Sequence, residues 1–186
     1  MNKLYVWWPH RDRNPGFFPH IDVGHASLDI SFNQGLGRAE YVSWWPAPGS
    51  TGYNPAGSGW AQRSFMDDCV SEGTQSAPLP PYRTVVFGGL DEDKMRARWQ
   101  AIKRTGNYQM YYNNCAATVA DVLRVGGADL AAEVRYRMGQ VIVWTPWDLL
   151  EVVQLIAGFS SKIERLRAEG WKSEDELSVR LMHMPH

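Results

Sequence analysis

The sequence has few cysteines, no long apolar run and no excess of charge, and each absence excludes a class of protein. Its two cysteines, Cys69 and Cys115, are too few for the disulfide framework of a small secreted domain. No stretch of about 18 apolar residues occurs, so we expect no integral membrane segment. The formal net charge of −1 gives no bulk attraction for polyanions, so no nucleic acid is expected as a partner.

Sequence signals for targeting, metal and cofactor binding are also missing. The opening MNKLYVWWPHRDRNPGFF has no apolar signal-peptide core and no small-residue cleavage site, so we expect synthesis in the cytoplasm without a signal peptide. No CxxC pair and no Rossmann or phosphate-loop glycine pattern occurs. A zinc site formed by His20, His25 and Cys115 would match no common ligand spacing. We therefore expect neither a metal nor a cofactor.

What is present fits one globular domain over residues 1–186, with 44% apolar residues and 12% aromatic residues, nine of them Trp. Residues 46–81 are rich in Gly, Pro and Ser and predict a long surface excursion, with a short ordered piece around WAQRSFMDDCV. Residues 145–186 are expected to form a C-terminal helical extension.

Strict alternation of apolar and polar residues over 25–32 predicts a half-buried strand with His25 on its polar face. The turn NQGLG then leads to a second strand over 38–45, so these segments predict a hairpin. Shorter strands are expected at 3–8 and within 82–89. Together they predict a small antiparallel sheet.

Helix signals follow the strands. Asp91 is expected to cap a helix over 92–104, and another helix is expected to begin near Asn114 or Cys115. Thr145, followed by Pro146, predicts the start of a third helix, and the charged segment SSKIERLRAEG after it is amphipathic. The fold class is therefore α+β, with the sheet packed on the helix that begins at Cys115 and extra helices at the C-terminal end.

Two residues in this pattern suggest nucleophilic catalysis. Cys115 lies at a helix N-terminus, where free amides and the helix dipole favour a thiolate. His25 would act as its base, and such a base needs a polar group to orient its ring. The hairpin places Ser43 on the face of His25, because cross-strand neighbours share a face. Glu40 would be a stronger electrostatic partner, but the same pairing directs it to the opposite face.

The order of GHASLDI, YVSWWP and NNCAATVADVL resembles the circularly permuted papain-like fold. That group includes permuted NlpC-type hydrolases, lecithin retinol acyltransferase-like enzymes and bacterial type VI secretion effectors. The resemblance implies His25 as the base, Cys115 as the nucleophile and the position of Ser43 as the orienting group. Acyltransferase-like members carry a second histidine at that position, and Ser43 departs from this.

The function expected from these residues is a cysteine hydrolase that cleaves an amide or ester through an acyl-enzyme. The oxyanion would be held by the backbone N–H of Cys115 and by Asn114 or Asn113. The resemblance to effectors implies a peptidoglycan peptide or amide as the substrate, and delivery by a secretion-system carrier into the periplasm of a rival cell. It also implies an immunity protein that protects the producer.

Two other classes fit the same residues. The first is a phospholipase or acyltransferase on this fold, which would be distinguished by an apolar, membrane-facing surface beside the site. The second is a non-catalytic binding module with a degenerate pocket, which would be distinguished by a large separation between His25 and Cys115. Cys69 is expected to be a small buried hydrophobic residue.

Overall fold

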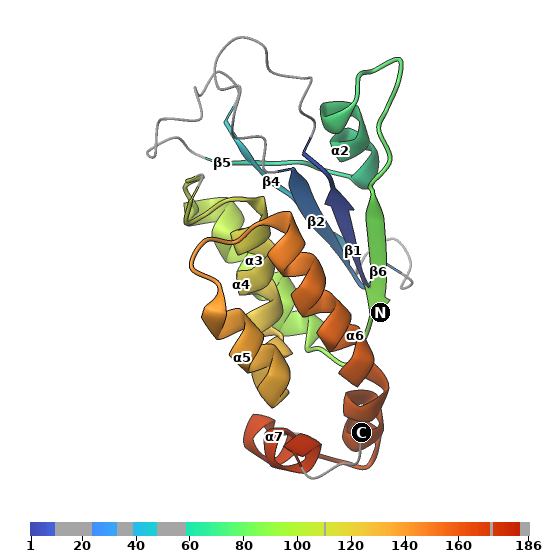
Figure 1. Ribbon diagram of the computed structural model, residues 1–186, viewed down its shortest axis with the longest axis vertical. Coiled ribbons are helices and arrows are strands. Elements are labelled where there is room, and N and C mark those ends of the chain that lie inside the picture. The colour runs from blue at the N-terminus through green and yellow to red at the C-terminus, as the bar shows by residue number, and fades with distance from the viewer. Residues whose placement is uncertain (10–23, 33–38, 48–58, 110, 172, 183–186) are drawn as a thin grey trace.

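The computed structural model describes residues 1–9, 24–32, 39–47, 59–109, 111–171 and 173–182 (Figure 1). The strands are β1 (Asn2–Trp7), β2 (His25–Ile30), β3 (Glu40–Val42), β4 (Trp44–Pro46), β5 (Gly59–Ala61) and β6 (Arg83–Phe87). The helices are α2 (Phe65–Glu72), α3 (Glu92–Thr105), α4 (Cys115–Val125), the 3-10 turn η1 (Ala128–Leu130), α5 (Ala132–Gln140), α6 (Pro146–Ala168) and α7 (Glu174–Met182). The expected turn NQGLG and most of the expected loop after β1 lie outside the described residues.

The main sheet has four strands in the order β3-β2-β1-β6, and each neighbouring pair is antiparallel. This confirms the expected α+β class with a small antiparallel sheet. The expected second hairpin strand over 38–45 is wrong in one respect, because it is broken at Ser43. β3 ends at Val42, and β4 instead pairs with β5 in a separate two-stranded sheet. The backbone carbonyl of Ser43 accepts from Gln62 N–H, which draws the chain away from β2.

Helices α3, α4 and α6 lie side by side over one face of this sheet (Figure 1). The alternating apolar residues of β1 and β2, such as Leu4 and Leu28, are fully buried in a core formed with these helices. α4 contributes Val119 and Leu123 to the same core. Each such side chain stabilises the fold by roughly 1.5–3 kcal/mol when it leaves water, so this packing fixes where α4 begins relative to β2.

Helix α2 packs on the other face of the sheet and lies near the end at which β2 begins (Figure 1). Its Phe65 and Cys69 pack with Tyr5 and Trp7 of β1. Within the segment expected to be a surface excursion, the described part thus contains β5 and a helix with two buried residues, Asp68 and Cys69.

Helix α6 is longer than the sequence predicts and continues through SSKIERLRA to Ala168. Its start has the expected Thr145 cap, here a full capping box with Asp148, and Pro146 in the first position. Ile163 and Leu166 are buried in the core, which explains why the helix continues. Among the described residues, no helix combines the length and apolar character needed to cross a membrane.

Candidate active site

His25 is the first residue of β2, at the end of the sheet closest to α2. It is 2% exposed, and its ring lies between the rings of Trp7 and Trp45, at centroid distances of 5.5 and 4.3 Å. It follows Gly24, whose φ of 72° is readily adopted only by glycine. The aromatic neighbours therefore hold the ring in place, and its two nitrogens are free to make polar contacts.

Asp68 of α2 is the acidic partner of His25. Its Oδ2 lies 3.1 Å from His25 Nε2, and the Asp68 side chain is fully buried. The same Oδ2 accepts a hydrogen bond from the Tyr41 hydroxyl at 2.5 Å. Oδ1 accepts from the Ser43 hydroxyl and from Trp45 Nε1, both at 2.8 Å. A buried carboxylate with this many donors is well compensated for its loss of water.

Asp68 is a site residue that the sequence patterns did not predict. The sequence nevertheless contains a signal for it: at helical spacing, Asp68 lies on the same face as the apolar residues Phe65 and Cys69. An acidic residue on such a face must be paired when the helix is buried. The Gly- and Pro-rich surroundings obscured the helix itself.

Ser43 lies on the same face as His25, as the hairpin register predicts. Its Oγ is 3.2 Å from His25 Nε2 and donates to Asp68, and the residue is fully buried. Ser43 therefore contacts both the ring and the carboxylate that orients it. Glu40 lies on the other face, where its carboxylate accepts from Gln100 and pairs with Lys103 of α3.

Cys115 is the first residue of α4 and is 3% exposed. Its thiol interacts with the His25 ring by hydrogen bonding and by charge, so the structure brings the predicted pair together. His25 Nε2 already faces Asp68 and Ser43, which leaves Nδ1 for the thiol. The large separation of His25 and Cys115 that would mark a degenerate pocket is therefore not observed.

Asn114 caps the helix that carries Cys115. Its side-chain oxygen caps α4 by accepting from Ala117 N–H, and its Nδ2 donates to the Trp144 carbonyl, both at 2.8 Å. These two bonds hold the start of α4 against the residue before Thr145, and the role of Asn114 toward an oxyanion stays a prediction. Asn113 is exposed and lines a groove described below.

Electrostatics favour a charged histidine in this cluster. Burial by itself lowers the pKa of His25, but the negative charges of Asp68 and Cys115 and their hydrogen bonds outweigh it and raise that pKa to about 10. Burial would raise the pKa of Asp68, but the charge of His25 and the hydrogen bonds from His25, Tyr41 and Ser43 hold it below its usual value. The two shifts have opposite directions because the charged forms stabilise each other.

Two cavities flank this cluster. The first, of about 210 Å³, is lined mostly by apolar side chains and includes Trp7, which also contacts His25. Trp8, Tyr82 and Trp147 close around it, with ring centroids 5.6 Å apart for each pair that includes Trp8. All three rings are about half exposed, so the cavity opens to solvent through an aromatic rim.

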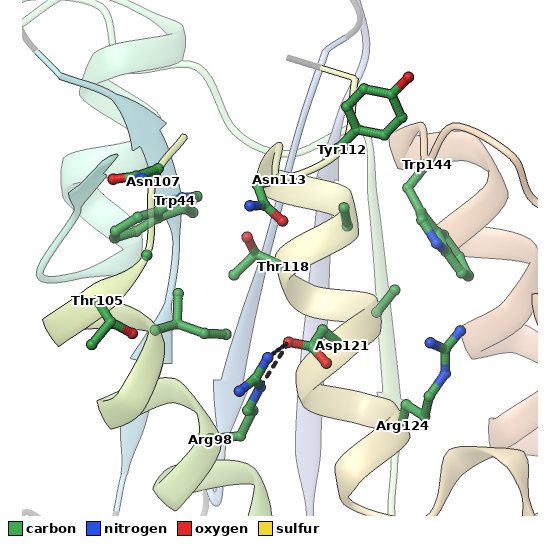
Figure 2. A pocket seen from close by; sticks show the side chains of 14 residues that line it. Trp44, Arg98, Thr105, Asn107, Tyr112, Asn113, Thr118, Asp121, Arg124 and Trp144 are labelled. Carbon is green, nitrogen blue, oxygen red and sulfur yellow. Dashed lines mark hydrogen bonds and ion pairs between the residues drawn. The ribbon is translucent and has the colours of Figure 1, made fainter. Parts of the chain in front are cut away.

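The second cavity is a groove of about 380 Å³ over the exposed face of α4, shown in Figure 2. Asn113 and Tyr112 lie at its end nearest the start of α4, while Arg98, Asp121 and Arg124 lie further along the helix. The lining is mainly polar. Among the described residues, no group of three or more His, Cys, Asp or Glu side chains is placed to hold a metal ion, and His20 lies outside them.

The fold and the site together define an α+β domain with a buried cysteine, histidine and aspartate at one end of its sheet. A family model described as the IcsB middle domain matches residues 81–173, half of the chain, and the chain therefore belongs to the IcsB middle domain family. The matched residues include Cys115 but neither His25 nor Asp68.

The chain is also similar to two large bacterial toxins. It is 38% identical over 72 residues to the multifunctional-autoprocessing repeats-in-toxin of Vibrio vulnificus, a match that covers 37% of this chain and 1% of the toxin. A toxin of the same name from Vibrio cholerae serotype O1 is 36% identical over 70 residues, covering 37% of this chain and 2% of the toxin. The chain thus has toxin-like or effector-like character, although it spans a very small part of these relatives.

Neither comparison names a papain-like or NlpC-type family. No solved structure matches the chain.

Proposed function

We propose that this protein is a cysteine-dependent acyl-transfer enzyme in which Cys115 is the nucleophile, His25 the general base and acid, and Asp68 the orienting carboxylate. The observation that supports this most directly is the buried chain of contacts from Cys115 through His25 to Asp68. Buried charges are costly unless paired, and here three ionisable groups share one pocket at a helix start and a strand start. The resemblance to permuted papain-like enzymes supports the same roles.

In the first half of the reaction, the Cys115 thiolate attacks a carbonyl carbon and the His25 imidazolium holds the proton. The carbonyl oxygen becomes an oxyanion, which the backbone N–H of Cys115 is placed to receive because the first-turn amides of a helix have no intrahelical partner. The C–N or C–O bond then breaks, and His25 gives its proton to the leaving nitrogen or oxygen. The product is a thioester on Cys115.

In the second half, water or another nucleophile attacks the thioester carbonyl. Neutral His25 takes the proton of that nucleophile, the C–S bond breaks, and the thiolate and imidazolium are restored. Asp68 stabilises the His25 ring whenever it is an imidazolium, and it keeps Nδ1 of that ring directed toward sulfur. Ser43 supports this by contacting both the ring and the carboxylate.

Two acyl donors fit this chemistry. The resemblance to effectors favours the amide of a peptidoglycan peptide, cleaved in the periplasm of a target cell, with an immunity protein in the producer. The apolar cavity beside His25 favours a second candidate, an ester or thioester with an apolar acyl chain, as in the phospholipase and acyltransferase alternative. Toxin-like character is compatible with either substrate.

Intact-protein mass spectrometry tests the shared mechanism. The protein is mixed with p-nitrophenyl acetate, p-nitrophenyl octanoate or purified muropeptides, and both released product and a covalent adduct are measured. We expect an acyl adduct on Cys115 with at least one donor. Cys115→Ala should abolish both adduct and turnover, while Cys69→Ala, which removes the other buried thiol, should retain both. Adducts and turnover that persist in Cys115→Ala would refute the proposed nucleophile.

The same assay separates the two donors. If the apolar cavity binds the acyl chain, octanoate should be turned over faster than acetate, and Trp147→Ala should reduce that preference. Trp60→Ala is the matched control, since Trp60 is a similarly exposed tryptophan on β5 that does not line the cavity. Release of new amine termini from muropeptides, without a chain-length preference among esters, would favour the amidase.

A further inference from the structure

The groove over α4 in Figure 2 is a cavity whose lining includes none of Cys115, His25 and Asp68. Its floor is made of small residues of α4, Ala117 and Ala120, together with Thr118. α3 forms one wall, and Trp144 stands on the other side. Small side chains along this side of the helix leave room for another chain to lie against it.

The groove begins at the N-terminal end of α4, the helix that Cys115 starts, and follows that helix. Asn113 lies two residues before Cys115, and Arg124 lies nine residues after it on the same helix. At a rise of 1.5 Å per residue, the nine residues from Cys115 to Arg124 correspond to roughly 13.5 Å along the helix axis. An extended peptide advances about 3.3 Å per residue, so roughly four residues would span it.

The two arginines of the groove differ in their partners. Arg98 donates to the Asp121 carboxylate from two nitrogens, at 2.8 and 2.7 Å, so this pair carries no net charge. Among the residues that the structure describes, no hydrogen bond or ion pair involves the side chain of Arg124. The far end of the groove therefore presents one uncompensated positive charge.

We propose that this groove binds an extended peptide segment of the substrate and that Arg124 pairs with an acidic side chain about four residues from the reacting group. Asn113 and Asn107 offer side-chain amides at the near end, and each can both donate to and accept from a peptide group. A guanidinium is matched to a carboxylate because it can donate two parallel hydrogen bonds. The inference rests on the proposed function only in treating Cys115 as the reacting centre.

Binding is measured on Cys115→Ala protein, so that no turnover interferes. The probes are fluorescein-labelled octapeptides with an Ala/Gly/Ser background, in which Glu, Gln or Lys occupies each position in turn. Fluorescence anisotropy reports the affinity of each. We expect Glu to be preferred over Gln at one position by about fivefold, which is near the upper limit for an exposed ion pair.

Variants of the groove then assign the preference. Arg124→Glu should reverse it, so that Lys binds better than Glu at the same position. Arg165→Glu, which reverses an exposed charge on α6 outside the groove, should leave it unchanged. Ala117→Leu fills the floor and should weaken all peptides together. Thermal melts followed by circular dichroism check that each variant is folded.

Failure of this inference is distinct from failure of the enzyme mechanism. If acyl transfer by Cys115 is demonstrated but no peptide binds, or the Glu preference survives in Arg124→Glu, the groove assignment is overturned. If peptides bind with the expected charge preference but Cys115 forms no adduct, the groove assignment stands and the proposed reaction is what fails.

Discussion

Replacing Asp68 with asparagine removes the charge that faces His25 and keeps the size of the side chain. The two atoms that meet, Asp68 Oδ2 and His25 Nε2, are 3.1 Å apart. At an effective dielectric constant of about 20, unit charges at this separation attract by roughly 5 kcal/mol, or roughly four pKa units. Burial acts on His25 in the opposite direction. We therefore expect the His25 pKa to fall to about 6.5 or lower in Asp68→Asn.

The same change should lower stability in a pH-dependent way. The folded pKa of His25 is raised, so the stability it contributes is complete below about pH 6.5 and is lost as the pH rises through the folded value of about 10. The folded pKa of Asp68 is lowered, so its contribution is present above about pH 3.9 and is lost as the pH falls through the folded value. Breaking a buried pair costs about 3–5 kcal/mol, which we expect as the loss in unfolding free energy at pH 6.

Nuclear magnetic resonance of protein labelled with ¹⁵N-histidine measures this directly. The chain has five histidines, and loss of one signal in His25→Gln identifies the His25 resonance. Urea unfolding at pH 6 and pH 10 measures stability, and the difference between wild type and Asp68→Asn should be smaller at pH 10. Asp67→Asn is the matched control, because Asp67 precedes Asp68 on α2 but accepts from Ser64 at the helix cap. A His25 pKa that stays near its wild-type value in folded Asp68→Asn would refute this account.

Three further predictions concern residues around the same cluster. Ser43→Ala should lower turnover of a p-nitrophenyl ester by about tenfold to a hundredfold, since one neutral hydrogen bond is worth roughly 1–2 kcal/mol, and loss as complete as in Cys115→Ala would show a larger role. Asn114→Ala should reduce the unfolding free energy by about 1 kcal/mol in urea titrations, because it removes a helix cap; no change would contradict the capping role. At pH 7, iodoacetamide should label Cys115 faster than Cys69, as judged by peptide mass mapping, because burial and the charge of Asp68 raise the pKa of Cys69. Labelling of Cys115 should slow in His25→Ala, and equal, slow labelling of both thiols would argue against an activated nucleophile.

Local sequence patterns were sufficient to predict the elements that carry Cys115 and His25. Asp91, Asn114 and Thr145 mark helix starts because a cap satisfies amides only two or three residues away. The alternation after His25 indicates a strand because successive side chains of a strand point to opposite faces. These interactions are short in sequence, so the sequence by itself determined that a histidine begins a strand and a cysteine begins a helix.

Tertiary structure alone decided which groups complete the site. Asp68 reaches His25, 43 residues away in sequence, because the apolar face of α2 packs on Tyr5 and Trp7. Asn114 donates to the carbonyl of Trp144, 30 residues away in sequence, because the segment that leads into α6 lies beside the start of α4. An amide or a carboxylate can form hydrogen bonds with many different groups, and only the packing of distant elements decides which group it meets. For this reason the sequence determined that His25 begins a strand and Cys115 begins a helix, and the tertiary structure decided which carboxylate faces His25.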